Sequence, residues 1–146
     1  MGIVLDEASM KELQSRFDSL SFKEQKQAYR TGLVKSAGIV KRQAKRNINA
    51  APFRKNDDMK RKGISHKANV NSADSSFVDL RLNSWLRIFE GGTKAARQTK
   101  KSYNRGSIKG YQFFASALAT TKEQVFREME SNIFNAIEKK WQKANK

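Results

Sequence analysis

Two long segments with helical spacing constrain this 146-residue chain more than any other feature, because they flank a region whose hydrophobicity alternates. Apolar residues that recur every three, four or seven positions indicate an amphipathic helix. We therefore expect one long helix over residues 22–48 and another over residues 121–143. The first apolar stripe consists of Phe22, Tyr29, Leu33, Val40 and Ala44, and the second of Phe126, Met129, Ile133, Ile137 and Trp141, widened by Val125 and Phe134.

Local signals set the expected ends of the first long helix. Ser21 and Glu24 have the spacing of a capping box, in which each side chain accepts a hydrogen bond from the other's backbone N–H. Ala51-Pro52 ends the helix, because the residue before a proline avoids the helical region. Gly32 and Gly38 each weaken the helix by about 1 kcal/mol relative to alanine. Their presence indicates positions where another element packs closely.

Similar signals place the other helices. Asp6 is the expected cap of a short helix within residues 1–20. Thr120-Thr121-Lys122-Glu123 has the pattern of a second capping box, which predicts that the last long helix begins near residue 121. Residues 115–119 are expected to form one or two helical turns of their own before it.

The middle of the chain has the pattern of a β-hairpin. Residues 64–70 fit a strand, residues 71–75 are rich in turn formers, and residues 78–82 alternate between apolar and polar side chains. A short helix follows at residues 85–89, capped by Asn83 or Ser84. Residues 53–63 and 94–109 are polar and are expected to be loops. The fold class is therefore α+β, with two long helices packed on a small antiparallel sheet. We expect a single domain over residues 1–146, in which residues 22–143 form the main body after the short first helix.

The positive charge of the chain is concentrated in its middle. The net charge is +16 overall, and residues 41–105 contribute +12 of it, from 17 Lys and Arg against 5 Asp and Glu. Such a density attracts polyanions such as nucleic acid, without reading bases. A solvated surface and contact with acidic patches of a protein partner are the alternatives. The candidate polyanion- or partner-binding residues are Lys41, Arg42, Lys45, Arg46, Lys60, Arg61, Lys62, Lys94, Arg97, Lys100, Lys101 and Arg105.

We find no pattern typical of a catalytic, metal or cofactor site. The chain has no cysteine, and its one histidine, His66, has no ligand set beside it and is expected on the surface. Asp57-Asp58 lie between lysines and are expected to form ion pairs in a loop. Glu90-Gly91-Gly92-Thr93 lacks the spacing of a phosphate-binding loop, so its glycines are expected to allow a tight turn with positive φ. We expect no export signal and no membrane span.

Two short motifs resemble a known family. The segment Trp85–Thr93, which ends in Glu90-Gly91-Gly92-Thr93, resembles the aromatic-rich "Glu-x-Gly-Thr" stretch of small tail-component proteins of long-tailed bacteriophages. In that family an "aromatic-Leu-x-x-Ala-Leu" element follows a variable loop, and Phe113-Phe114-Ala115-Ser116-Ala117-Leu118 occupies its place here. The long helix that precedes Ala51-Pro52 also resembles theirs. Lys62-Gly63-Ile64 departs from the family's "Thr-Gly-x-Leu" step.

The resemblance implies a neck or tail-completion protein of the head–tail junction. Such a protein would assemble into a ring, dock on phage connector and tail-tube proteins, and lie beside packaged DNA without sequence specificity. It would be a monomer or weak oligomer when purified, and would be found in the host bacterial cytoplasm during assembly and then in the virion. A basic nucleic-acid-binding module that contacts phosphates is the alternative function, and an enzyme of unrecognised type is a third.

Overall fold

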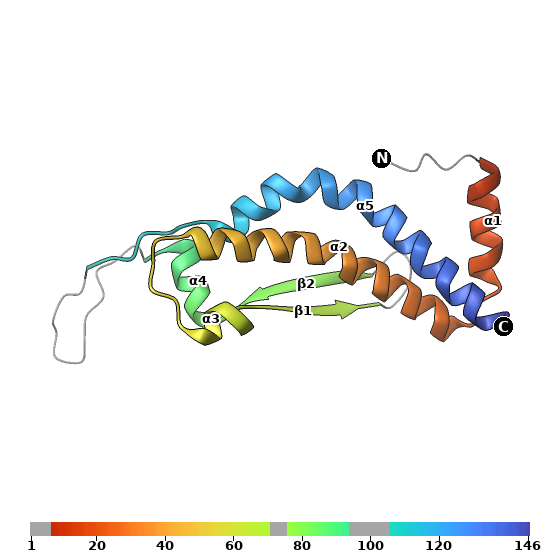
Figure 1. Ribbon diagram of the computed structural model, residues 1–146, viewed down its shortest axis with the longest axis horizontal. Helices are drawn as coiled ribbons and strands as arrows, with labels where there is room; N and C mark the ends of the chain where they lie inside the picture. The colour runs from red at the N-terminus through yellow and green to blue at the C-terminus, as the bar shows by residue number, and fades with distance from the viewer. Residues whose placement is uncertain (1–6, 71–75, 94–105) are drawn as a thin grey trace. The chain divides into compact units, whose positions relative to one another are not determined.

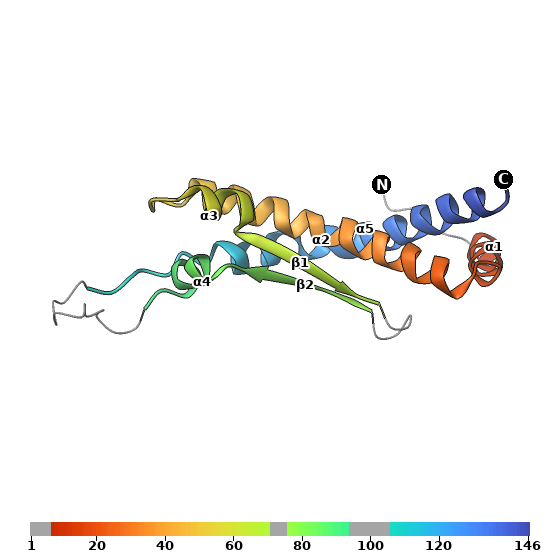
Figure 2. The same ribbon diagram turned by 90° about the horizontal axis from the view of Figure 1, so that it is seen from below.

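The computed structural model describes residues 7–70, 76–93 and 106–146 and confirms an α+β fold. The long helices pack on an antiparallel two-stranded hairpin, whose strands run side by side in opposite directions (Figures 1 and 2). The elements are α1 (Glu7–Asp18), α2 (Phe22–Ala50), α3 (Asp57–Lys62), β1 (Ile64–Asn69), β2 (Phe77–Leu82), α4 (Ser84–Gly91) and α5 (Phe113–Ala144). In these described ranges, no helix has both the length and the apolar content needed to cross a membrane.

The contacts within the chain define two compact units. Unit 1 comprises Met1–Val40, His66–Asp79 and Thr121–Lys146, and unit 2 comprises Lys41–Ser65 and Leu80–Thr120. Each unit has its own apolar core. The single domain over residues 1–146 stays a prediction.

The core of unit 1 holds α1 against the carboxyl-terminal part of α5. Its buried residues are Leu20, Ala28, Ala136 and Ile137, against which Leu13, Phe17, Ile133 and Trp141 pack. The guanidinium of Arg16 lies 4.7 Å from the centre of the Trp141 ring and forms an ion pair with Glu138. Hydrogen bonds to Glu138 and Glu12 raise the pKa of Arg16. The charged and aromatic contacts of Arg16 therefore attach α1 to α5.

The same unit contains a close helix–helix contact at Gly32. A Cβ atom at this position would lie 2.6 Å from Ile133 Cγ1 and 2.7 Å from Ile133 Cα. One turn away, the buried Ser36 hydroxyl donates to the Gly32 carbonyl and accepts a hydrogen bond from the Asn132 side chain. Gly32 thus marks close packing, as its place in the sequence predicts.

The core of unit 2 gathers residues from both long helices, α3, β1 and α4. Leu86 is fully buried at its centre, and Phe113 is 2% exposed. The buried members of this core are Ala44, Ile48, Met59, Ile64, Leu86, Phe113 and Ala117.

The predicted caps near Ser21 and Asn83 are confirmed. The Ser21 N–H donates to Glu24 Oε2 at 3.0 Å, and the Glu24 N–H donates to Ser21 Oγ at 3.4 Å. The helix that they open extends to Ala50, two residues beyond the predicted end. At α4, the Leu86 N–H donates to Asn83 Oδ1 at 2.8 Å. The predicted cap of α1, Asp6, lies outside the described residues.

The prediction of a separate last helix beginning near residue 121 is wrong, because α5 runs without a break from Phe113 to Ala144. The Thr120 hydroxyl does not cap a helix but donates back to the Ser116 carbonyl at 3.0 Å. Threonine can form this bond inside a helix, where it satisfies its own hydroxyl. The pattern of the capping box is therefore present without its function.

The prediction of a loop over residues 53–63 is also wrong, because residues 57–62 form α3. Asn56 caps this helix by accepting the Met59 N–H at 2.8 Å, and Met59 is buried in the unit 2 core. Asp57 therefore begins a helix rather than lying within a loop. Burial of the single apolar side chain in a charged stretch explains the helix.

Two residues of the predicted apolar stripes are exposed. Phe126 is 58% exposed and Phe22 is 66% exposed. Phe126 lies seven residues before Ile133 on the same helix face, but the described residues of α5 in the unit 1 core run from Ile133 to Trp141. Phe22 instead has the ammonium of Lys26 above its ring, 4.4 Å from the ring centre.

From the apolar stripe alone, Trp141→Ala and Phe126→Ala are each expected to lower the free energy of unfolding by about 3–5 kcal/mol. The exposure of the two side chains in the structure predicts different losses. Trp141→Ala removes the ring that packs on the unit 1 core and holds Arg16, so we expect a loss of about 3 kcal/mol. Phe126→Ala removes an exposed ring, so the expected loss is below about 1 kcal/mol. Urea denaturation of both variants measures the difference, and equal losses would contradict the packing described above.

Candidate functional site

The two motif segments meet in unit 2 through the side chain of Glu90. Its Oε2 accepts the Phe114 N–H and its Oε1 accepts the Ala115 N–H, each at 2.9 Å. Both N–H groups belong to the first turn of α5, where the helix has no internal acceptors for them and carries partial positive charge. Glu90 therefore caps a helix that begins 23 residues later in the chain.

Gly92 brings the backbones of the two segments into contact. Its φ of 71° lies in the left-handed region, and its N–H donates to the Ile88 carbonyl at 2.8 Å to end α4. A Cβ atom at Gly92 would lie 2.5 Å from the Gly110 nitrogen and 2.6 Å from the Ile108 oxygen. Both the conformation and the space thus require glycine. The predicted positive φ is confirmed at Gly92 and is wrong at Gly91, which is the last residue of α4.

Backbone hydrogen bonds continue this contact on both sides of Gly92. The Thr93 N–H donates to the Ile108 carbonyl at 2.9 Å, and the Ile108 N–H donates to Thr93 Oγ1 at 2.8 Å. The Tyr111 N–H donates to the Phe89 carbonyl at 2.9 Å. We call the paired segments 89–93 and 108–115 the clasp. It holds Thr93 and Ile108 together.

Aromatic side chains support the clasp. Phe53 stacks on Phe89, with ring centres 4.3 Å apart, and its ring centre lies 5.4 Å from that of Tyr111 and 6.2 Å from that of Phe113. The Asn47 side chain of α2 donates to the Phe113 carbonyl at 2.9 Å. Among the other motif positions, Ala117 is buried, Phe114 is half-buried and Leu118 is 49% exposed. The motif residues therefore have mainly structural roles.

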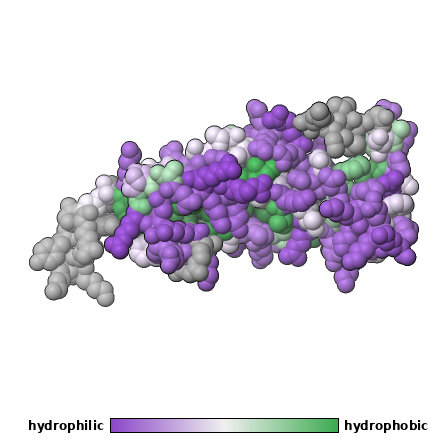
Figure 3. Space-filling model, viewed as in Figure 1, coloured by the Kyte–Doolittle hydropathy of each residue, from purple (hydrophilic) through white to green (hydrophobic). Residues whose placement is uncertain are grey.

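The basic residues predicted on the first long helix lie together on one side of α2. At about 100° per residue, Arg42 and Arg46 lie farthest from the buried Ala44 and Ile48, and Lys41 and Lys45 flank the buried face. Arg42 and Arg46 are exposed, and the two lysines are half-buried. Figure 3 shows that hydrophilic residues dominate the face of the molecule seen there. This cluster is available to a partner.

The remaining predicted basic residues fall into two groups. Lys60 and Lys62 are exposed on α3, and Arg61 belongs to the same helix. Lys94, Arg97, Lys100, Lys101 and Arg105 lie outside the described residues, between the two ends that the clasp joins.

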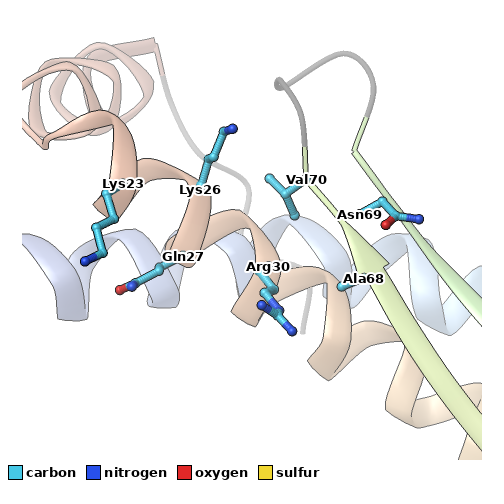
Figure 4. A pocket seen from close by; sticks show the side chains of 7 residues that line it. All are labelled: Lys23, Lys26, Gln27, Arg30, Ala68, Asn69 and Val70. Atoms are coloured by element: carbon cyan, nitrogen blue, oxygen red, sulfur yellow. The ribbon is translucent and has the colours of Figure 1, made fainter.

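The structure brings together a second set of cations that the sequence analysis missed, in unit 1. One hollow of about 380 Å³ is lined by α2 and by the end of β1 (Figure 4), and a second of about 440 Å³ is lined by α2 and α5. Both hollows include Lys23 and Gln27. We call their cations the unit 1 basic surface, which consists of Lys23, Lys26, Arg30, Lys140 and Lys143.

This surface was hidden because residues 1–40 have a net charge of only +1, from 6 Lys and Arg against 5 Asp and Glu. The spacing of Lys23, Lys26 and Arg30 at i, i+3 and i+7 is a signal that could have found its α2 part, because this spacing places the three on one helix face. Its α5 part depends on the fold.

The structure offers no arrangement typical of catalysis in the part of the chain that it describes. His66 is exposed, as predicted. Among the described residues, no group of three or more His, Cys, Asp or Glu side chains could hold a metal ion.

Comparison of the chain with protein-family models, curated proteins and solved structures finds no match.

Proposed function

We propose that the chain is a structural protein of the head–tail junction or tail of a long-tailed bacteriophage or prophage. It associates with itself into a ring and docks on connector and tail-tube proteins, first in the host cytoplasm and finally in the virion. The observation that carries the proposal is the capping of α5 by Glu90, which joins the two segments that resemble the tail-component family.

The clasp supports the proposal because it accounts for the motif residue by residue. Glu90 caps α5, Gly92 allows the backbones to touch, and Thr93 closes the pair with Ile108. A resemblance limited to short motifs gains weight when the matching residues perform one shared structural task. In this proposal the segment between Thr93 and Ile108, which we call the tied segment, docks on the partner protein.

The composition of the tied segment suits docking on a charged partner. Residues 94–105 contain five Lys and Arg and no Asp or Glu. Such a segment attracts an acidic protein surface or phosphates by long-range electrostatics.

A basic nucleic-acid-binding module is the second candidate function, favoured by the exposed Arg42 and Arg46 on α2. The two candidates differ in the kind of binding that they predict. A junction protein contacts DNA without sequence preference, whereas a regulatory module binds a specific site saturably at near-physiological salt. A mobility-shift assay with random and selected duplexes distinguishes them.

The proposal is tested by deleting the gene from a phage or prophage that carries it. We expect filled heads and free tails that fail to join, and complementation by the wild-type chain. The variant with Lys94, Arg97, Lys100, Lys101 and Arg105 changed to Gln is expected to fold but not to restore joining. A matched control changes five exposed cations elsewhere and is expected to restore it: Lys11, Lys35, Arg54, Arg127 and Lys139. Normal particles after deletion would contradict the proposal.

A further inference from the structure

The unit 1 basic surface concentrates positive charge more than the sequence around it suggests. It gathers five cations around one carboxylate, that of Glu24. Glu24 Oε2 accepts from the Ser21 N–H at 3.0 Å and from the Ser21 hydroxyl at 2.6 Å, and these bonds lower the pKa of Glu24. The carboxylate is therefore engaged at the start of its own helix, and the surface keeps a net charge of +4.

The five cations form two adjoining rows. Lys23, Lys26 and Arg30 follow one face of α2 over about 10 Å, at about 1.5 Å per residue. Lys140 and Lys143 come from α5, and the Lys140 ammonium donates to Gln27 Oε1 at 2.5 Å, which places the rows side by side. The Lys26 ammonium rests on the exposed Phe22 ring.

The lining of the two hollows fits phosphates better than other ligands. Ala68 and Val70 are the apolar residues that line them, so they lack the apolar walls that hold small organic molecules. The fully buried centre of a protein–protein interface is usually more apolar than the lining of these hollows. The Gln27 and Asn69 side chains can donate to phosphate oxygens, as amides do in protein–DNA contacts.

We propose that the unit 1 basic surface binds the phosphate backbone of double-stranded DNA without reading its bases. Successive phosphates of one strand rise about 3.4 Å along the duplex axis, so a row of about 10 Å meets several of them. The inference does not depend on the proposed phage function, because it concerns binding by the purified chain alone.

Fluorescence anisotropy with a labelled duplex of arbitrary sequence, at several salt concentrations, tests the proposal. Replacing Lys23, Lys26 and Arg30 with Gln is expected to weaken binding at least about tenfold at low salt. It should also reduce the slope of log K against log salt by about 2.7, at about 0.9 for each phosphate that the variant no longer neutralises. A second variant from the other row, Lys140→Gln with Lys143→Gln, should reduce the slope by about 1.8.

A matched control has the same charge change at exposed positions outside the hollows, namely Lys35→Gln, Arg127→Gln and Lys139→Gln. We expect it to bind nearly as the wild type does. Equal weakening in the control and the test variants would overturn the proposal, because net charge alone would explain binding. Absence of binding by the wild-type chain would also overturn it. So would displacement of the labelled duplex by poly-glutamate as effectively as by unlabelled duplex of the same total charge. The second outcome would point to an acidic protein instead.

Discussion

Gly92→Ala is expected to lower the free energy of unfolding by about 3 kcal/mol, from positive-φ strain and overpacking together. The new Cβ atom would lie 2.5 Å from the Gly110 nitrogen, and backbone on both sides leaves it no room. At this chain length the loss corresponds to a fall in Tm of about 10 °C. Thermal unfolding followed by circular dichroism measures it.

The adjacent glycine supplies the control. A Cβ atom at Gly91 would meet no atom within 4 Å, and Gly91 is the last residue of α4. Gly91→Ala should therefore leave Tm unchanged or raise it slightly. If the two variants unfold at the same temperature, the clasp does not hold the segments as described.

Gly32→Val is the second substitution with a large expected effect, a loss of about 3 kcal/mol from overpacking the contact between α2 and α5. The added side chain would occupy the space of the Ile133 backbone, whose Cα lies 2.7 Å from the Cβ position. Urea denaturation should show a lower midpoint. A rotated side chain cannot relieve the clash, because the nearest atoms include main chain.

Thr31→Val is the matched control for this substitution. Thr31 is exposed on the same helix, and valine has nearly the same shape as threonine. The change removes a hydroxyl that donates to the Gln27 carbonyl, within the helix and open to solvent. We expect a change below about 0.5 kcal/mol. A loss at Gly32 no larger than that at Thr31 would contradict the close packing of Gly32 against Ile133.

The parts of the fold that depend on near neighbours could be predicted from the sequence. The Ser21–Glu24 box and the Asn83 cap act within three or four residues, and the alternation of residues 78–82 reflects a half-buried strand. The capping-box pattern at Thr120 has the same spacing, but the helix start that it predicts is wrong. A helix that already runs through this position needs no cap.

Contacts between distant residues account for most of what the sequence could not predict. Glu90 was identified as a motif residue, but its role depends on the start of α5, 23 residues later. Phe126 has the right spacing for the core, yet the described core residues of α5 in unit 1 begin at Ile133. The unit 1 basic surface needs Lys140 and Lys143 from the far end of the chain.

Electron cryomicroscopy of the head–tail junction of the phage or prophage particle tests the proposed function most directly. The proposal predicts a closed ring of copies of this chain between the connector and the tail tube, with the segment between Thr93 and Ile108 in contact with a neighbouring protein. A complete junction whose density contains no copy of the chain would contradict it.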